Sequence, residues 1–153
     1  QHDMDVSPLF ERWQVPGYPG VRLPCDAGLS AHLFGAVSAC LAGDGASFYE
    51  NSDGMPPRLH RGLMASGDRF VTCAQVSRAL REPLVAAGHD VLAVEMEGAA
   101  VAQVCLDYGV PFAAMRTISD RADDDAHVDF PAFIQTVASR YADHIVRHLL
   151  KTL

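Results

Sequence analysis

A seven-residue run at 94–100, Val-Glu-Met-Glu-Gly-Ala-Ala, marks the point where an apolar stretch passes into a helix. The apolar residues predict a short buried strand over 91–95, and the following residues predict an amphipathic helix over 97–108 that stops at Gly109. In an open α/β sheet, ligands bind beside the carboxyl ends of the strands. Two carboxylates at such an end therefore predict a binding pocket.

The same alternation of strand and helix continues on both sides of this run. The pattern predicts helices over 27–41, 73–85 and 129–150, strands over 59–65 and 110–118, and irregular segments over 1–25 and 44–57. Asp26, Thr72 and Asp129 are placed to cap the helices, and Gly43 is placed to end the first. This order favours an α/β sheet with right-handed crossovers.

Composition excludes several classes of partner. A formal net charge of −7 disfavours a nucleic-acid backbone, and no apolar run is long enough to span a bilayer. The opening residues have no basic or apolar segment, so we expect no signal peptide. The four cysteines form no CxxC pair, and we predict neither a metal site nor a cofactor, in a reducing and cytoplasmic setting.

Chemically useful side chains gather at the predicted strand ends, at 66–71, 95–97 and 119–120. Glu97 can accept hydrogen bonds from vicinal hydroxyls, and Met96 offers an apolar face to a sugar. Asp120 acts as an acid where burial and nearby acids favour its protonated form, and Ser119 can orient it. Phe70 can stack on a flat heterocycle.

Each of these residues also has a structural interpretation. Alone, Glu97 fits an acid in the first turn of a helix, Asp120 fits a solvated turn acid, and Phe70 fits a core residue. Arg116 fits an ion-pair partner of Glu95 or Glu97. Only their shared position at strand ends favours a site over these alternatives.

The irregular segment at the start of the chain has its own pattern. It is punctuated by prolines and contains the aromatic residues Phe10 and Trp13, which is typical of a binding or interface loop. Residues 6–16, called the arm below, pack no obvious local core. We therefore expect the arm to contact a partner subunit in a homodimer.

Together these motifs resemble the 5′-methylthioadenosine/S-adenosylhomocysteine nucleosidases, and they follow that family's order at 2–6, 66–71, 93–105, 110–112 and 116–123. The Glu-Met-Glu and Ser-Asp motifs are shared with purine nucleoside phosphorylases, whereas His127 and Phe130 after the Ile-Ser-Asp run favour the nucleosidases. The resemblance implies a three-layer α/β/α, nucleoside phosphorylase-like fold with a mostly parallel or mixed sheet. Residues 1–153 would form one domain, the C-terminal part of the nucleosidase domain, without its N-terminal strands.

The resemblance also implies hydrolysis of the adenine N-glycosidic bond of methylthioadenosine or adenosylhomocysteine. On the base side, it implies that Asp120 protonates the purine at N7 and that Ser119 positions this carboxyl. The backbone of Val71 would read the adenine edge while Phe70 stacks nearby.

On the sugar side, the resemblance implies that Glu97 holds the ribose hydroxyls and Met96 packs on the ring, with Glu95 and Arg116 in support. In the arm, it implies that four residues close over the 5′-substituent in the neighbouring subunit: Val6, Leu9, Phe10 and Pro16. The family's water-activating glutamate has no counterpart in residues 1–153. A purine nucleoside phosphorylase, or an inactive chain that only dimerises or binds adenine, are therefore alternatives.

Overall fold

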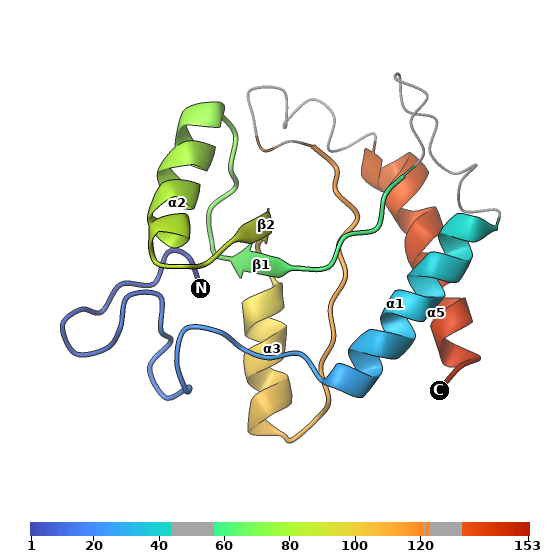
Figure 1. The fold of residues 1–153 in the computed structure, drawn as a ribbon, viewed down its shortest axis with the longest axis horizontal. Coiled ribbons are helices and arrows are strands. Elements are labelled where there is room, and N and C mark those ends of the chain that lie inside the picture. The colour runs from blue at the N-terminus through green and yellow to red at the C-terminus, as the bar shows by residue number, and fades with distance from the viewer. Residues whose placement is uncertain (44–56, 121, 123–132) are drawn as a thin grey trace.

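The computed structural model describes residues 1–43, 57–120, 122 and 133–153. Helices and strands alternate along the chain (Figure 1), which confirms the predicted α/β class. The elements are α1 (Ala27–Ala42), β1 (Leu63–Ser66), α2 (Ala74–Ala86), β2 (Val91–Glu95), α3 (Gly98–Asp107), η2 (Ile134–Ala138) and α5 (Ser139–Leu150).

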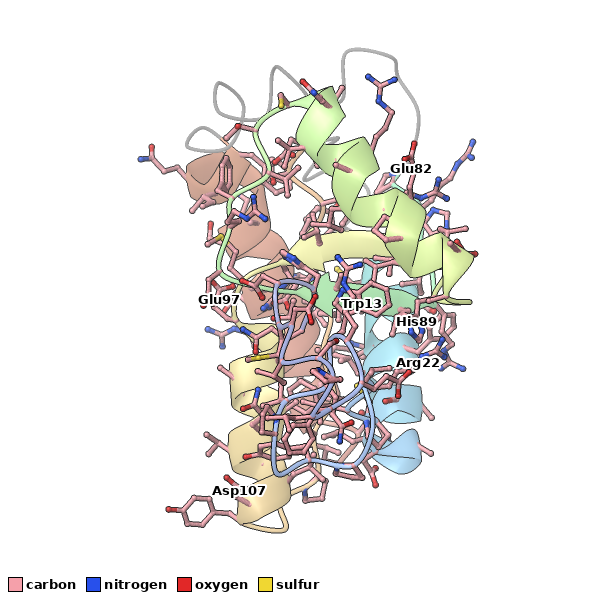
Figure 2. The ribbon with its side chains drawn as sticks, turned by 90° about the vertical axis from the view of Figure 1, so that its left-hand side faces the viewer. Trp13, Arg22, Glu82, His89, Glu97 and Asp107 are labelled. Atoms are coloured by element: carbon pink, nitrogen blue, oxygen red, sulfur yellow. The ribbon has the colours of Figure 1, made fainter. Side chains whose placement is uncertain are left out.

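β1 and β2 pair in parallel, and their carboxyl ends meet where Ser66 lies opposite Glu95. In both views α2 lies above this pair and α3 below it (Figures 1 and 2). The arrangement gives helix, sheet and helix in successive layers around the strand ends. The pair of α1 and α5 packs together to the side of the sheet in Figure 1.

The prediction of a buried strand over 110–118 is wrong. The run carries no regular structure, and its ends are open to solvent, with Val110 53% and Ile118 60% exposed. A strand exists only where a neighbour pairs with its N–H and C=O groups. In the part of the chain that the structure describes, the run meets α1 instead: the carbonyl of Phe112 accepts a hydrogen bond of 2.7 Å from the backbone N–H of Asp26.

The predicted helix boundaries hold with small changes. Asp26 caps α1 as predicted, accepting a 2.7 Å hydrogen bond from the N–H of Leu29, and Gly43 ends the helix. Thr72 does not cap α2, because the helix begins later and Cys73 takes the N-cap position. The predicted cap of the last helix at 129 lies outside the described residues.

The predicted strand over 59–65 is shorter and shifted, since β1 begins at Leu63. Its partner strand is short, and the register starts where Leu63 meets Val91, so the residues before it have no ladder to join. Leu59 packs instead against the α1–α5 cluster, whose buried members are Ala36, Val37, Cys40, Tyr141 and Ile145.

A second buried cluster lies between the sheet and α2 and contradicts the expectation that the arm packs no local core. Trp13, only 8% exposed, packs with Ala65 of β1 and Leu84 of α2. Its ring also meets the ring of His89 edge to face at 5.6 Å. Among the described residues, no helix combines the length and the apolar character that a membrane crossing requires.

Candidate active site

Glu95, the last residue of β2, is the centre of the polar contacts at the strand ends. Its carboxylate is 8% exposed and pairs with the guanidinium of Arg116 at 2.5 Å. The same oxygen accepts hydrogen bonds from the backbone N–H groups of Glu97 at 3.1 Å and Gly98 at 2.6 Å. Glu95 therefore satisfies free donors at the start of α3 as well as a cation.

The ionised form of Glu95 is stabilised by its neighbours. Burial would raise the pKa of Glu95, but hydrogen bonds from Ser66, Arg116 and the backbone amides outweigh it and lower this pKa below its ordinary value. The hydroxyl of Ser66 is both donor and acceptor, since its oxygen also accepts a 3.0 Å hydrogen bond from the N–H of Ala99. Sequence reasoning did not assign a role to Ser66.

Gly98 is a second residue that sequence reasoning did not single out. A Cβ atom at this position would lie 2.7 Å from Oε1 of Glu95. A side chain at this position would therefore displace the Glu95 carboxylate from its place at the first N–H groups of α3. The Glu-x-x-Gly spacing across the strand-to-helix turn was the available signal.

Arg116 forms ion pairs with both of the glutamates that were considered as its partners. The guanidinium of Arg116 contacts Glu97 at 3.5 Å as well as Glu95, so the expectation of an ion-pair partner is confirmed. Glu97 occupies the N-cap position of α3 but caps nothing with its side chain, which is 73% exposed. Its carboxylate is available to a ligand at the edge of the sheet (Figure 2).

Phe70 and Val71 lie between β1 and α2. Val71 is buried at 5%, whereas Phe70 is 43% exposed, so the interpretation of Phe70 as a core residue is wrong. Met96, between the two glutamates, is 38% exposed. The apolar side chains of Phe70 and Met96 and the carboxylate of Glu97 are therefore all open to solvent.

Ser119 and Asp120 form a pair at the end of the irregular run. The hydroxyl of Ser119 donates a 2.6 Å hydrogen bond to one oxygen of Asp120, and the N–H of Ala122 donates to the other at 2.7 Å. Ala122 has a positive φ of 52°, a conformation that side chains rarely adopt. The turn therefore holds both oxygens of Asp120 in a defined orientation.

The arm has an exposed tip and is held to the rest of the protein at Trp13. The carbonyl of Val6 accepts hydrogen bonds from the N–H groups of Leu9 at 3.1 Å and Phe10 at 3.4 Å, which folds the tip into a turn. Leu9 is 84% exposed and Phe10 39% exposed, and Pro16 is also exposed. Trp13 is fixed in the core, next to His89 in Figure 2.

A parallel strand pair between helices, with a carboxylate cluster at its carboxyl edge, places the chain among the α/β proteins. In open α/β sheets, that edge is where ligands bind. A family model described as the phosphorylase superfamily matches residues 1–151, and the chain belongs to this superfamily.

Named relatives are nucleosidases. The chain is 36% identical over 148 residues to a 5′-methylthioadenosine/S-adenosylhomocysteine nucleosidase of an Exiguobacterium species, covering 95% of this chain and 54% of that protein. The nucleosidase of Neisseria meningitidis, solved in complex with methylthio-immucillin-A, superposes with a TM-score of 0.78 at 31% identity, covering 99% of this chain and 58% of that one. Futalosine hydrolase of Helicobacter pylori has a TM-score of 0.74 at 30% identity, covering 100% and 57%. The chain thus spans about half the length of the proteins it matches.

Proposed function

We propose that the protein to which this chain belongs hydrolyses the N-glycosidic bond between adenine and a 5′-substituted ribose, with methylthioadenosine or adenosylhomocysteine as substrate. The observation that carries the proposal is the cluster of Glu95, Arg116 and Glu97 at the strand ends. In this cluster Glu95, whose side chain is 8% exposed, holds Arg116 in place, and the exposed Glu97 is left for a ligand. The named relatives support the same reaction.

On the sugar side, Glu97 accepts hydrogen bonds from the ribose hydroxyls. A carboxylate beside a ring on which positive charge develops binds the transition state more tightly than the ground state. Met96 packs on the sugar, and Arg116 keeps the Glu97 carboxylate near the ring through their 3.5 Å contact.

On the base side, Asp120 gives a proton to N7 of adenine while the C–N bond breaks, so that adenine leaves as a neutral molecule. A water molecule adds to the ribose carbon in its place, and the proton that this water loses restores the charge balance. Ser119 and the N–H of Ala122 orient the carboxyl for this transfer. Phe70, 43% exposed, stacks near the base, and the backbone of Val71 reads its edge.

We also propose that the protein acts as a homodimer in the cytoplasm. In this dimer, the arm of one subunit closes over the 5′-substituent in the other. The exposed Leu9 and Phe10 support this role for the arm, and the four unpaired cysteines suit a reducing compartment. Residues 1–153 are one part of the nucleosidase domain.

Product analysis tests the reaction. The protein expressed from its whole open reading frame is incubated with methylthioadenosine, adenosylhomocysteine or futalosine, with and without phosphate. We expect adenine and free methylthioribose from methylthioadenosine, at rates independent of phosphate. A ribose 1-phosphate formed only with phosphate would make the protein a phosphorylase, and cleavage of futalosine alone would make it a hydrolase of that nucleoside.

A further inference from the structure

We propose that Ser66 is a positioning residue for the ribose-binding carboxylate of Glu97 and acts on it through Glu95 and Arg116. Ser66 ends β1, and the segment that carries Phe70 and Val71 begins directly after it. The proposal rests on the proposed role of Glu97 and adds a residue that touches neither base nor sugar.

The hydroxyl of Ser66 joins elements that are distant in the sequence. It donates to the carboxylate of Glu95 on β2 and accepts a 3.0 Å hydrogen bond from the N–H of Ala99 on α3. The backbone continues the link, because the N–H of Gly67 donates a 3.1 Å hydrogen bond to the carbonyl of Glu95. One side chain therefore locks the end of β1 to the start of α3.

Two ion pairs of Arg116 connect Glu95 to the proposed ribose-binding residue, Glu97. Glu95 holds the guanidinium of Arg116, which in turn lies 3.5 Å from Glu97. Because Glu97 is 73% exposed, this contact is what orients its carboxylate, and the orientation depends on a Glu95 that Ser66 keeps in place. In the part of the chain that the structure describes, the charged groups around Glu95 are Arg116 from the irregular run, which pairs with it, and Glu97 from its own turn.

The expected effect is selective for the sugar. In the protein expressed from its whole open reading frame, Ser66→Ala should lower kcat/KM for the riboside about tenfold, since a hydrogen bond to a charged group is lost. The 2′-deoxyriboside should lose less, and adenine should bind as before. Ser38→Ala is the matched control, because that hydroxyl donates to the carbonyl of Phe34 within α1.

A second pair of variants protects the test against a folding defect. Ser66→Thr keeps the hydroxyl, and Ser66→Val has the shape of the threonine variant but lacks the hydroxyl. We expect the Thr variant to retain discrimination and the Val variant to lose it. Because Ser66 lowers the pKa of Glu95, the Val variant should also move the acidic limb of the rate profile to higher pH.

Two results would overturn the proposal: equal losses on riboside and deoxyriboside, or Ser66→Val behaving like Ser66→Thr. If the unaltered protein releases no adenine, the proposed function fails by itself. The role of Ser66 is then tested by a carbon-13 NMR titration of Glu95 in the Thr and Val variants. A higher pKa of Glu95 in the Val variant supports the link to Ser66, and identical titrations refute it.

Discussion

Glu95 and Glu97 are separated by one residue and have opposite environments. Glu95 is buried and bonded to an arginine and two backbone amides, whereas Glu97 is exposed and touches only the same arginine in the contacts described. A buried, fully paired carboxylate is a structural group, because moving it would leave Arg116 without its closest partner. At the scale of the residue, this difference supports the proposed roles, in which the first glutamate holds Arg116 and the second binds the sugar.

We predict that Asp120→Asn lowers adenine release by about 10²–10⁴-fold, because the amide cannot give up a proton to the leaving base. Inhibitor binding should change little, since the amide keeps the size and the acceptor oxygen. Steady-state kinetics and calorimetric titration of a nucleoside analogue measure the two effects. Turnover within a few-fold of the unaltered protein would show that Asp120 is not the acid.

Glu97→Gln tests recognition of the sugar. We expect it to reduce the preference for a ribosyl over a 2′-deoxyribosyl substrate by about tenfold, because hydrogen bonds from the hydroxyls to a charged acceptor are lost. The measurement is kcat/KM on both substrates for both proteins. The same preference in the variant and the unaltered protein would rule out this role for Glu97.

At the scale of the element, the start of α3 shows how one helix positions the site. Its first N–H groups are taken by Glu95 and Ser66 instead of by a side chain at the N-cap position. The negative carboxylate also suits the positive end of the helix dipole. This arrangement leaves the side chain of the N-cap residue, Glu97, exposed, and a Cβ atom at position 98 would collide with the Glu95 carboxylate.

Two helix glycines should respond to alanine in opposite ways. Gly98→Ala should destabilise the protein by about 1–3 kcal/mol, because its Cβ would displace a Glu95 carboxylate that is held by several hydrogen bonds. Gly35→Ala, inside α1 with no atom within 4 Å of the added Cβ, should stabilise it by about 0.5–1 kcal/mol. Denaturant unfolding measures both. A Gly98→Ala protein as stable as the unaltered one would mean that the carboxylate moves freely.

At the scale of the whole molecule, the arm is a fixed extension of the body. Trp13 anchors it in the core. The segment that follows the arm is also held in place, since the hydroxyl of Tyr18 donates a 2.8 Å hydrogen bond to Asp107 at the end of α3, and Arg22 binds the ring of His89 and the carbonyl of Gly88. The tip is therefore presented in a defined place. A preformed loop loses little conformational entropy when it binds a partner.

Replacing both tip residues, Leu9→Ser with Phe10→Ser, should weaken the homodimer about tenfold, because these side chains lose apolar contact area. It should also raise KM for methylthioadenosine. Analytical ultracentrifugation of the protein from its whole open reading frame measures the first effect. Val85→Ser, at a similarly exposed apolar position on α2, is the control. A fully active monomer at micromolar concentration would contradict the dimer.

Part of the site could be read from the sequence because its signals are local. The strand-to-helix turn at Glu95–Gly98, the cap at Asp26 and the Ser119–Asp120 pair depend on residues within a few positions of one another. The prediction of a strand over 110–118 failed because an apolar run fits a strand or an irregular half-buried segment equally well. Only a neighbouring strand distinguishes the two.

The sequence by itself determined the order of the helices and of the first two strands, the ends of α1, and the position of Glu95 at the end of β2, since periodicity and capping act over one or two turns. The tertiary structure decided which glutamate is buried, that Trp13 faces inward, and that Ser66 matters. Arg116 lies 21 positions from Glu95, and Ala99 lies 33 from Ser66. Such contacts form only when the folded chain brings distant segments together, and no local pattern encodes them.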